Sequence, residues 1–223
     1  MSGNTVLPQM VKMYCLKNCV TVFGMRIVVI NTKGGVAKTT SSMFLAAALA
    51  AKGSVELWDA DPQGSTAEWA LRAAEDGDPL PFPVRSVTRS ELADASASAE
   101  ADFTIVDTGP ADTRIMNAAL SNASAAIIPT APGGLDLART WETEAQASKV
   151  VDSYVLVTRV DGRTRAAKEI QTVLQESGVG YFETMIPRRE AIGQAFGSNP
   201  SRNFHGYDKV AEELLEVLNG REA

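Results

Sequence analysis

The sequence contains very little cysteine, histidine or aromatic residue. Of its 223 residues, two are cysteine and one is histidine, and aromatic side chains make up 6%. Cys15 and Cys19 lie close together and far from His205, so they provide two metal ligands at most, too few for a structural zinc site. The same scarcity excludes an iron–sulfur cluster and a Cys-His nucleophile. It leaves His205 as the only histidine for a Ser-His-Asp mechanism.

The sequence also lacks an excess of positive charge and long apolar runs. Its formal net charge is −6 and its pI is near 4.9, which excludes nucleic-acid binding through overall basicity but not through a local patch. The longest apolar run, residues 43–51, is much shorter than the ~20 residues of a membrane span. Lys12, Lys17 and Arg26 interrupt the N-terminal apolar stretch, where we find no signal-peptide cleavage site. We therefore expect a cytoplasmic protein.

The apolar residues that are present suffice for one core. The hydrophobic content of 45% and the length predict one domain over residues 25–223. Residues 1–24 have weak periodicity, and we interpret them as an N-terminal extension, either a loose tail or the product of a misplaced start codon. From Met25 onward, strand-like runs occupy residues 25–31, 54–59, 82–87, 103–106, 125–128, 154–157 and 181–186.

Helix-like segments separate these runs, among them residues 39–52, 64–74 and 208–218, whereas residues 93–101 suit either an exposed helix or a loop. Alternation of strands and helices is typical of βαβ units. It predicts the α/β class, with one doubly wound, mainly parallel sheet covered by helices on both faces. In such sheets functional residues collect at the carboxyl ends of the strands.

The strongest functional signal is the segment NTKGGVAKTT, residues 31–40, between the first strand and the first helix. Glycines let a loop turn its N–H groups toward phosphate oxygens, and the helix N-terminus adds positive potential. Lys38 provides a full charge for the β- and γ-phosphates, and the Thr39 hydroxyl is placed to ligate Mg²⁺. A strand–helix turn without a ligand is the alternative, and the combined pattern disfavours it.

The loop departs from the strict G-x-x-x-x-G-K-[ST] pattern, because Thr32 replaces the first glycine and Ala37 precedes Lys38. It fits the deviant form K-G-G-x-x-K-[ST], which begins with an additional lysine, Lys33. In this the chain resembles the ParA/MinD group of P-loop ATPases, most of all the short ParA proteins that partition plasmids and chromosomes. The resemblance extends from about Met25 to the C-terminus.

This resemblance implies a sheet of about seven or eight strands and a homodimer that sandwiches two ATP molecules. Lys33 would reach the partner's site and act like an arginine finger supplied in trans. The family usually has glycine at the position of Ala37. The implied nucleotide-binding residues of the loop are Lys33, Gly34, Gly35, Val36, Ala37, Lys38, Thr39 and Thr40.

Two further motifs place carboxylates after strands. DADPQGS, residues 59–65, follows the second strand, and an apolar strand ends in Asp107 like a Walker B element. Carboxylates beside a phosphate site can order water or hold Mg²⁺. The resemblance implies that Asp61 polarises the hydrolytic water, and that Asp59 belongs to the outer shell of the metal. We thus predict a metal set of Thr39, Asp59 and Asp107 and a catalytic set of Lys33, Lys38 and Asp61.

Later segments match the family more loosely. Residues 156–161 and 185–189 resemble the two segments that enclose the adenine, which makes Thr158, Arg159 and Pro187 candidate base contacts. As an alternative, Pro187 simply ends a strand.

ParA-like dimers bind DNA without sequence preference, through Lys and Arg side chains. Residues 151–223 contain 9 basic and 11 acidic side chains, so only a local patch suits this role. Our candidates are Arg163, Arg165, Lys168, Arg188 and Arg189, and an ordinary solvated surface explains them almost as well. The last helix is acidic, which disfavours MinD-like membrane attachment.

The resemblance therefore implies a Mg²⁺-dependent ATPase that converts ATP to ADP and phosphate. Its ATP dimer would grip DNA, and a ParB-like centromere-binding partner would trigger hydrolysis and release, giving a nucleoid-associated partition protein. Three alternatives share some of these motifs: a nucleotide switch that positions another cargo, a MinD-like regulator, and a metabolic P-loop ligase.

Overall fold

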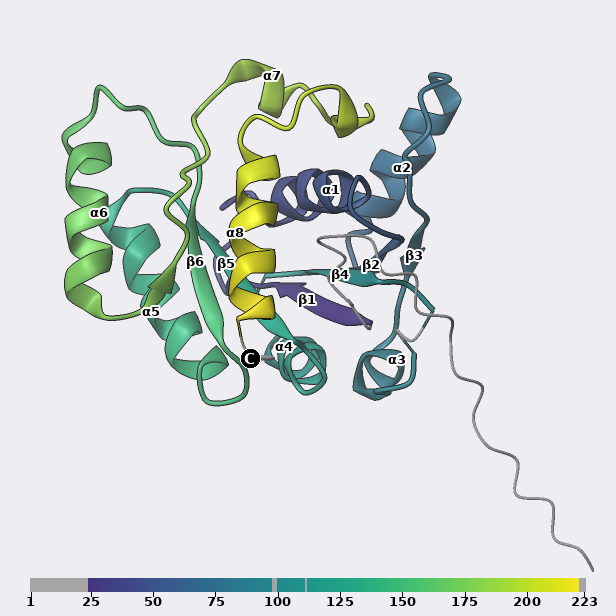
Figure 1. The fold of residues 1–223 in the computed structure, drawn as a ribbon, viewed down its shortest axis with the longest axis horizontal. Helices are drawn as coiled ribbons and strands as arrows, with labels where there is room; N and C mark the ends of the chain where they lie inside the picture. Colours follow the sequence, from purple (N-terminus) through teal and green to yellow (C-terminus); the bar gives the residue numbers. More distant parts are fainter. Residues whose placement is uncertain (1–23, 98–99, 111, 221–223) are drawn as a thin grey trace, which may run out of the picture.

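The computed structural model describes residues 24–97, 100–110 and 112–220 (Figure 1). The N-terminal extension expected over residues 1–24 lies almost wholly outside them. One sheet of 7 parallel strands forms the centre of the described chain, which confirms the predicted fold class. The strands follow the order β3 (Val84–Ser86), β2 (Val55–Ala60), β4 (Phe103–Thr108), β1 (Met25–Val29), β5 (Ala125–Thr130), β6 (Ser153–Val157) and β7 (Gly180–Tyr181).

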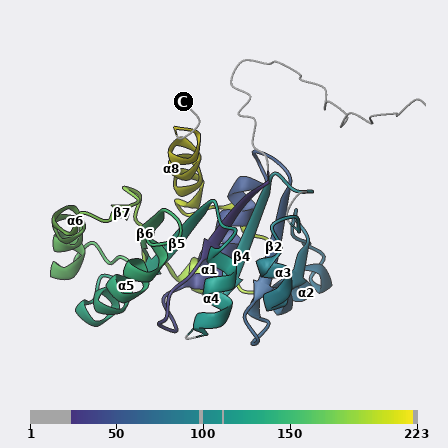
Figure 2. The same ribbon diagram turned by 90° about the horizontal axis from the view of Figure 1, so that it is seen from below.

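Helices cover both faces of this sheet, as Figures 1 and 2 show. One face carries α1 (Lys38–Leu49), α2 (Ser65–Glu75), α7 (Glu190–Gly193), the 3-10 turn Pro200–Arg202 and α8 (Tyr207–Asn219). The other face carries α3 (Arg89–Ala93), α4 (Thr113–Leu120), α5 (Gly134–Ala147) and α6 (Arg165–Ser177). Successive strand residues point to opposite faces, so each layer of helices has its own apolar core.

The central position of α1 follows from its composition. Its sequence KTTSSMFLAAAL is buried at ten of its positions, from Lys38 to Leu49, so the helix has no solvent face. A helix that is apolar all round belongs in the interior, and its alanines let neighbouring elements approach closely. The helix contacts α8 as well as the sheet, mostly through β4 and β2, so neighbours on several sides hold it in place.

One predicted strand is wrong in its extent. Residues 181–186 were expected to be extended, but regular pairing is limited to β7, at Gly180–Tyr181. The reason is that the N–H groups of Glu183 and Thr184 donate to the Glu213 carboxylate of α8, at 2.8 and 3.0 Å, instead of to a strand. The chain returns to the sheet further on, where Pro187 forms an isolated bridge with Val160.

The segment that was left open between helix and loop, residues 93–101, is mostly irregular in its described part. A short helix precedes it instead, α3, whose first turn is closed by a capping box between Thr88 and Glu91.

The strand order places a crevice at the carboxyl end of β1. The chain leaves β1 toward β2 on one side, whereas β5 lies on the other side of β1. Ligands of open parallel sheets bind at such a switch point, beyond the carboxyl ends of the strands. The loop that follows β1 is the predicted phosphate loop.

Candidate nucleotide-binding site

The phosphate loop between β1 and α1 turns by means of two left-handed residues. Gly35 has φ +74°, and Ala37, the last residue before α1, has φ 69° and ψ 31°. An L-residue in this conformation costs roughly 1–2 kcal/mol, so the methyl group of Ala37 introduces strain where glycine is the usual residue. Ala37 has no side-chain oxygen to cap the helix, so the first N–H groups of α1 stay available to an anion.

Lys38 holds its ammonium group over this loop. Its Nζ donates to the carbonyl oxygen of Lys33 at 3.0 Å, and the residue is 7% exposed. Burial lowers the pKa of Lys38, while Asp107 and Asp61 act in the opposite direction. The ammonium group is therefore fixed at the centre of the loop, where it can meet phosphate oxygens.

Asp107 lies at the bottom of the site, fully buried. Its two carboxylate oxygens accept hydrogen bonds from the hydroxyls of Thr39, at 2.8 Å, and Ser42, at 2.9 Å. Asp59 is its register partner on the neighbouring strand. The carboxylate of Asp59 accepts from the N–H groups of residues 61 and 67, which fixes the turn after β2. The two predicted metal carboxylates and Thr39 thus come together.

Burial raises the pKa of Asp107 from 3.8 to about 7. The hydrogen bonds from the Thr39 and Ser42 hydroxyls lower this pKa, but they do not outweigh the effect of burial. In the unfolded chain this carboxyl ionises near its ordinary pKa, so between pH 4 and 7 the folded state binds more protons. The contribution of Asp107 to the free energy of unfolding of the nucleotide-free protein should therefore fall as pH rises through this window and level off above pH 7.

Asp107→Asn should remove this dependence. We expect the variant to unfold with a free energy close to that of the parent at pH 4 and higher by about 2–4 kcal/mol at pH 8, measured by urea denaturation without nucleotide or Mg²⁺. Asp112→Asn is the matched control, because hydrogen bonds from Ile115 and Arg114 lower the pKa of Asp112. A difference at Asp107 that does not grow with pH would contradict the burial argument.

Asp61 lies on the turn after β2, at the edge of the same crevice. Its Oδ1 accepts a hydrogen bond from the Gln63 N–H at 3.0 Å, and the residue is half-buried. The carboxylate rests against Gly109, where a Cβ atom would come within 2.8 Å of Oδ1. Glycine at position 109 therefore leaves room for the predicted catalytic carboxylate in this position.

A pocket of about 1250 Å³ opens beside the phosphate loop. Its lining includes Ala37 and the three predicted base contacts Thr158, Arg159 and Pro187. The two adenine-like segments meet there: the Val160 N–H donates to the residue 186 carbonyl at 3.0 Å, and the residue 188 N–H donates to the Val160 carbonyl at 2.9 Å. The Thr158 hydroxyl is 3.1 Å from the Thr130 carbonyl oxygen, so it also ties β6 to β5.

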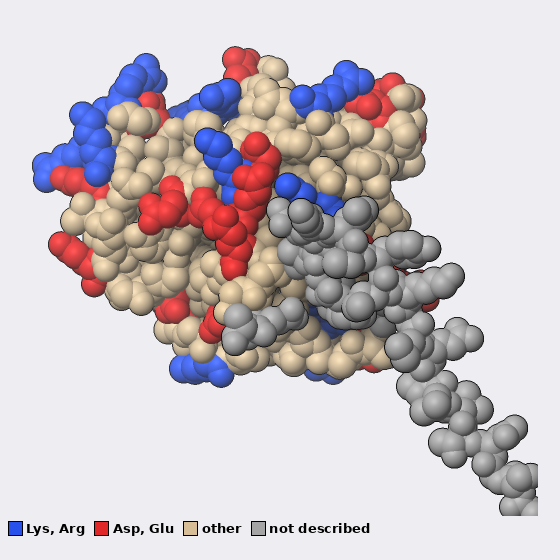
Figure 3. Space-filling view, in the orientation of Figure 1, with Lys and Arg blue, Asp and Glu red and all other residues tan. Residues whose placement is uncertain are grey.

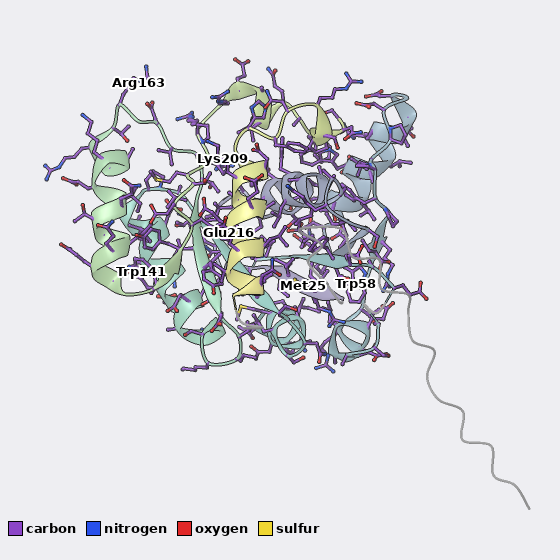
Figure 4. All side chains as sticks on the ribbon, in the orientation of Figure 1. Met25, Trp58, Trp141, Arg163, Lys209 and Glu216 are labelled. Carbon is purple, nitrogen blue, oxygen red and sulfur yellow. The ribbon has the colours of Figure 1, made fainter. Side chains whose placement is uncertain are left out.

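The five candidate DNA contacts do not form one uniform patch. Arg163 lines the pocket together with Arg188 and Arg189, whereas Arg165 and Lys168 lie on α6. Basic side chains gather over this corner in Figure 3, and Figure 4 labels Arg163 there. Carboxylates already pair with two of the five. Arg163 binds Asp161 and Arg165 binds Glu169, each pair at 2.7 Å.

Several polar residues of the site were not predicted from the sequence. Ser42 follows Thr39 by three residues and therefore shares its helix face, a spacing that could have identified it. Tyr207 lines the pocket and hydrogen-bonds Ser41 at 2.9 Å. The Asp136 carboxylate accepts a hydrogen bond from Lys33. No local pattern marks Tyr207 or Asp136, because their distance from the loop along the chain conceals the contact.

The sequence also matches a family model and several known proteins. Residues 27–200 match the family model described as the CobQ/CobB/MinD/ParA nucleotide binding domain. The chain is 38% identical to maintenance of carboxysome distribution protein A of Gloeobacter kilaueensis, over 84% of this chain and 93% of the relative. It is 32% identical to the chromosome-partitioning ATPase Soj of Thermus thermophilus, over 85% of this chain and 95% of the relative.

Among solved structures, a plasmid partition protein from Borrelia burgdorferi bound to AMPPNP superimposes with a TM-score of 0.68 at 18% identity. The match covers 88% of this chain and 99% of that chain, and it confirms the fold.

Proposed function

Because the chain belongs to the CobQ/CobB/MinD/ParA family and is an ATPase of ParA/MinD type, we propose that it is a positioning ATPase. In this proposal its ATP-bound homodimer binds DNA without sequence preference, and a partner protein linked to the cargo triggers hydrolysis. The observation that carries the proposal is the place of Lys33 and Lys38, two lysines on one loop beside a pocket large enough for a nucleoside. Lys38 would neutralise the triphosphate of its own subunit, and Lys33 would remain available for the triphosphate of a second subunit.

The proposed nucleotide would place its phosphates on the loop and its base in the pocket. The phosphates would lie over residues 33–40, with Lys38 at the β- and γ-phosphates and the N–H groups of α1 around them. The base would enter the pocket between the segments that carry Thr158, Arg159 and Pro187. The loop joins the pocket at Ala37, so a single extended ligand can occupy both.

Mg²⁺ suits the donor set at the bottom of the site. The Thr39 hydroxyl and the carboxylates of Asp59 and Asp107 provide only oxygen atoms, which this ion prefers. Asp107 is buried with hydroxyl donors around it, and burial raises its pKa, so a cation there would favour its ionised form. Thr39 and Asp107 would hold the ion together with phosphate oxygens, and Asp59 would act through water. When bound, Mg²⁺ supplies charge that stabilises the phosphates.

Asp61 is the residue that we assign to the attacking water. It stands at the edge of the crevice, free of any ion pair among the described residues, and its turn is fixed by Gln63. A carboxylate in this position can accept a hydrogen bond from water and orient it toward the γ-phosphate. Lys38 and the partner's lysine would stabilise the charge that develops on the transferred phosphoryl group.

The test of the proposal is a DNA-binding assay with ATP, with ADP and without nucleotide, each across a salt series. We expect binding only with ATP, independent of sequence and steeply weakened by salt, because phosphate contacts release counterions. Equal binding in all three nucleotide states would contradict the switch. Absence of DNA binding with ATP would exclude DNA as the track.

Among the five candidate DNA contacts, we expect Arg188 and Arg189 to contribute more to DNA binding than Arg163 and Arg165. Equal charge is removed by Arg188→Gln/Arg189→Gln and by Arg163→Gln/Arg165→Gln, but carboxylates already hold the second pair. The first double variant should weaken DNA binding about 10-fold and lower the salt slope by about 2. Filter binding at saturating ATP measures both effects.

A matched control is Arg72→Gln/Arg89→Gln, which removes two exposed arginines outside the predicted set. Arg72 of this pair binds Glu68. Equal losses in all three double variants would show that overall charge, and not this corner, determines DNA binding.

Two cargoes are in question. The partition of a plasmid or chromosome with a ParB-like partner is supported by the resemblance to ParA proteins and by the 32% identity to a chromosome-partitioning ATPase. The distribution of a protein compartment is favoured by a different observation, the 38% identity to a protein named for carboxysome distribution. Deleting the gene separates the two: loss of plasmid or chromosome inheritance supports the first, and clustered compartments with normal inheritance support the second.

In the described part of the chain, no helix is both apolar enough and long enough to span a bilayer.

The membrane-regulator and ligase alternatives receive less support. Acidic side chains cover the exposed face of α8 in Figure 3, and Figure 4 labels Glu216 and Lys209 on this helix. Anionic lipid would repel such a face.

Product analysis with ATP and candidate acids tests the ligase, and release of ADP and phosphate alone would exclude it.

A further inference from the structure

Lys33 does not extend freely from the phosphate loop. Its ammonium group donates a hydrogen bond to the carboxylate of Asp136, in the first turn of α5. The pair is partly buried, with 36% of the Lys33 side chain and 21% of the Asp136 side chain exposed. The proposed dimer needs the same ammonium group at the partner's phosphates. One ammonium cannot satisfy both positions, so the internal pair must open when the dimer closes.

The position of Asp136 is fixed by further contacts of α5 with the loop. Asn31 donates its amide to the Thr140 hydroxyl at 3.4 Å, and the Thr32 N–H donates to the Thr143 hydroxyl at 3.3 Å. Residues 136, 140 and 143 follow one another at helical spacing and share one face of α5. Both threonines are fully buried. The helix therefore cannot move away from the loop easily, and Asp136 stays beside the first lysine.

We propose that Asp136 is a positioning residue, which holds Lys33 on its own subunit until a second ATP-loaded copy offers its phosphates. This proposal rests on the proposed dimer function. The internal pair exists in the free subunit and is exchanged for a pair with phosphate in the dimer, so it opposes dimer formation. Each dimer opens two such pairs. The effect of Asp136 on the dimer constant is therefore the square of its effect on one subunit.

The experiment compares full-length Asp136→Asn, Asp136→Glu and the parent by sedimentation velocity with AMPPNP, which avoids turnover. A partly exposed ion pair changes an equilibrium constant by at most about fivefold per subunit, so Asp136→Asn should lower the dimer dissociation constant by up to about 25-fold. Asp136→Glu keeps the carboxylate and should stay near the parent. Glu142→Gln is the control, because Glu142 lies on the same helix but pairs with Arg139.

A second background shows whether Asp136 acts through Lys33. Removing a negative charge near the phosphates could strengthen nucleotide-dependent association without any lysine. In the Lys33→Ala background, Asp136→Asn should therefore change the dimer constant less than twofold. The proposal is wrong if the full strengthening persists without Lys33, or if Asp136→Asn weakens the dimer when Lys33 is present.

The internal contact is also tested without nucleotide, so that failure of the proposed function and failure of this inference remain distinct. If the parent does not dimerise with AMPPNP, the proposed dimer function fails. Acylation of lysines by an N-hydroxysuccinimide ester, followed by mass spectrometry, then measures the contact alone. Asp136→Asn should label Lys33 severalfold faster and leave Lys52 unchanged. An unchanged rate at Lys33 would overturn the assignment of Asp136.

Discussion

Lys38→Ala is expected to reduce ATP affinity by at least about 100-fold, because it removes a charge-assisted hydrogen bond to phosphate from a buried position. The ammonium of Lys38 is held over the loop by the Lys33 carbonyl, 3.0 Å away, and the residue is 7% exposed. No other cation is fixed at this place among the residues that the structure describes. Isothermal titration with ATP and Mg²⁺ measures the loss.

The structure separates this loss from unfolding. Burial lowers the pKa of Lys38, which means that the folded protein carries this charge at a cost when nucleotide is absent. The variant should therefore unfold at the same temperature as the parent or higher without ATP, while its stabilisation by ATP disappears. Lys52→Ala removes an exposed lysine just beyond the other end of α1 and should change neither property. Retained ATP binding in Lys38→Ala would refute the phosphate-loop assignment.

The sequence predicted the main features of the fold because they depend on local patterns. The buried β-branched runs identified β1, β4 and β5, since a strand between two layers of helices must be apolar on both faces. It overestimated the strand at residues 181–186, because the contact that ends regular pairing there comes from Glu213 on a distant helix. A side chain 30 residues away leaves no trace in a local pattern.

In the candidate site too, features that depend on local sequence were predictable, whereas contacts between distant residues were not. The loop follows β1 directly, and Asp59 and Asp107 lie at the carboxyl ends of β2 and β4, so their meeting at one sheet edge was predictable. The surroundings of the basic residues were only partly predictable. Arg165 and Glu169 have i,i+4 spacing on α6, which could have indicated their ion pair. The pairing of Arg163 with Asp161, and its place with Arg188 and Arg189 at the pocket beside the phosphate loop, depend on loop geometry that residue spacing does not determine.

The contact between Lys33 and Asp136 joins a residue that the sequence singled out to a partner that only the tertiary structure reveals. The family resemblance implied a lysine that acts on a second subunit, and the tertiary structure adds an internal partner for it. The same helix explains the residue that departs from the strict loop pattern. The hydroxyl and the N–H of Thr32 both contact the Thr143 hydroxyl, at 3.2 and 3.3 Å, so α5 fixes the place where a glycine would otherwise stand.

Asp61→Ala is expected to leave ATP binding within about threefold of the parent and to lower turnover by a factor of about 10²–10⁴, the usual contribution of general acid–base catalysis. Its carboxylate stands at the crevice edge, next to Gly109, with one hydrogen bond from the turn at Gln63. It is only half-buried and takes no part in an ion pair among the described residues, so its removal should not disturb the fold. Phosphate release under single-turnover conditions measures the effect.

Two further variants make this result specific to the carboxylate. Asp61→Asn keeps an oxygen for the Gln63 N–H, so it should preserve the turn and still lose turnover, because an amide is a far weaker acceptor of a proton from water. Glu68→Ala removes an acid of α2 that pairs with Arg72 and should retain full activity. Because Asp61→Ala should bind ATP without consuming it, it should also accumulate the dimer and prolong DNA binding. An Asp61→Ala enzyme with normal turnover would remove Asp61 from catalysis, and then the water would have to be oriented by another group at the same edge of the sheet.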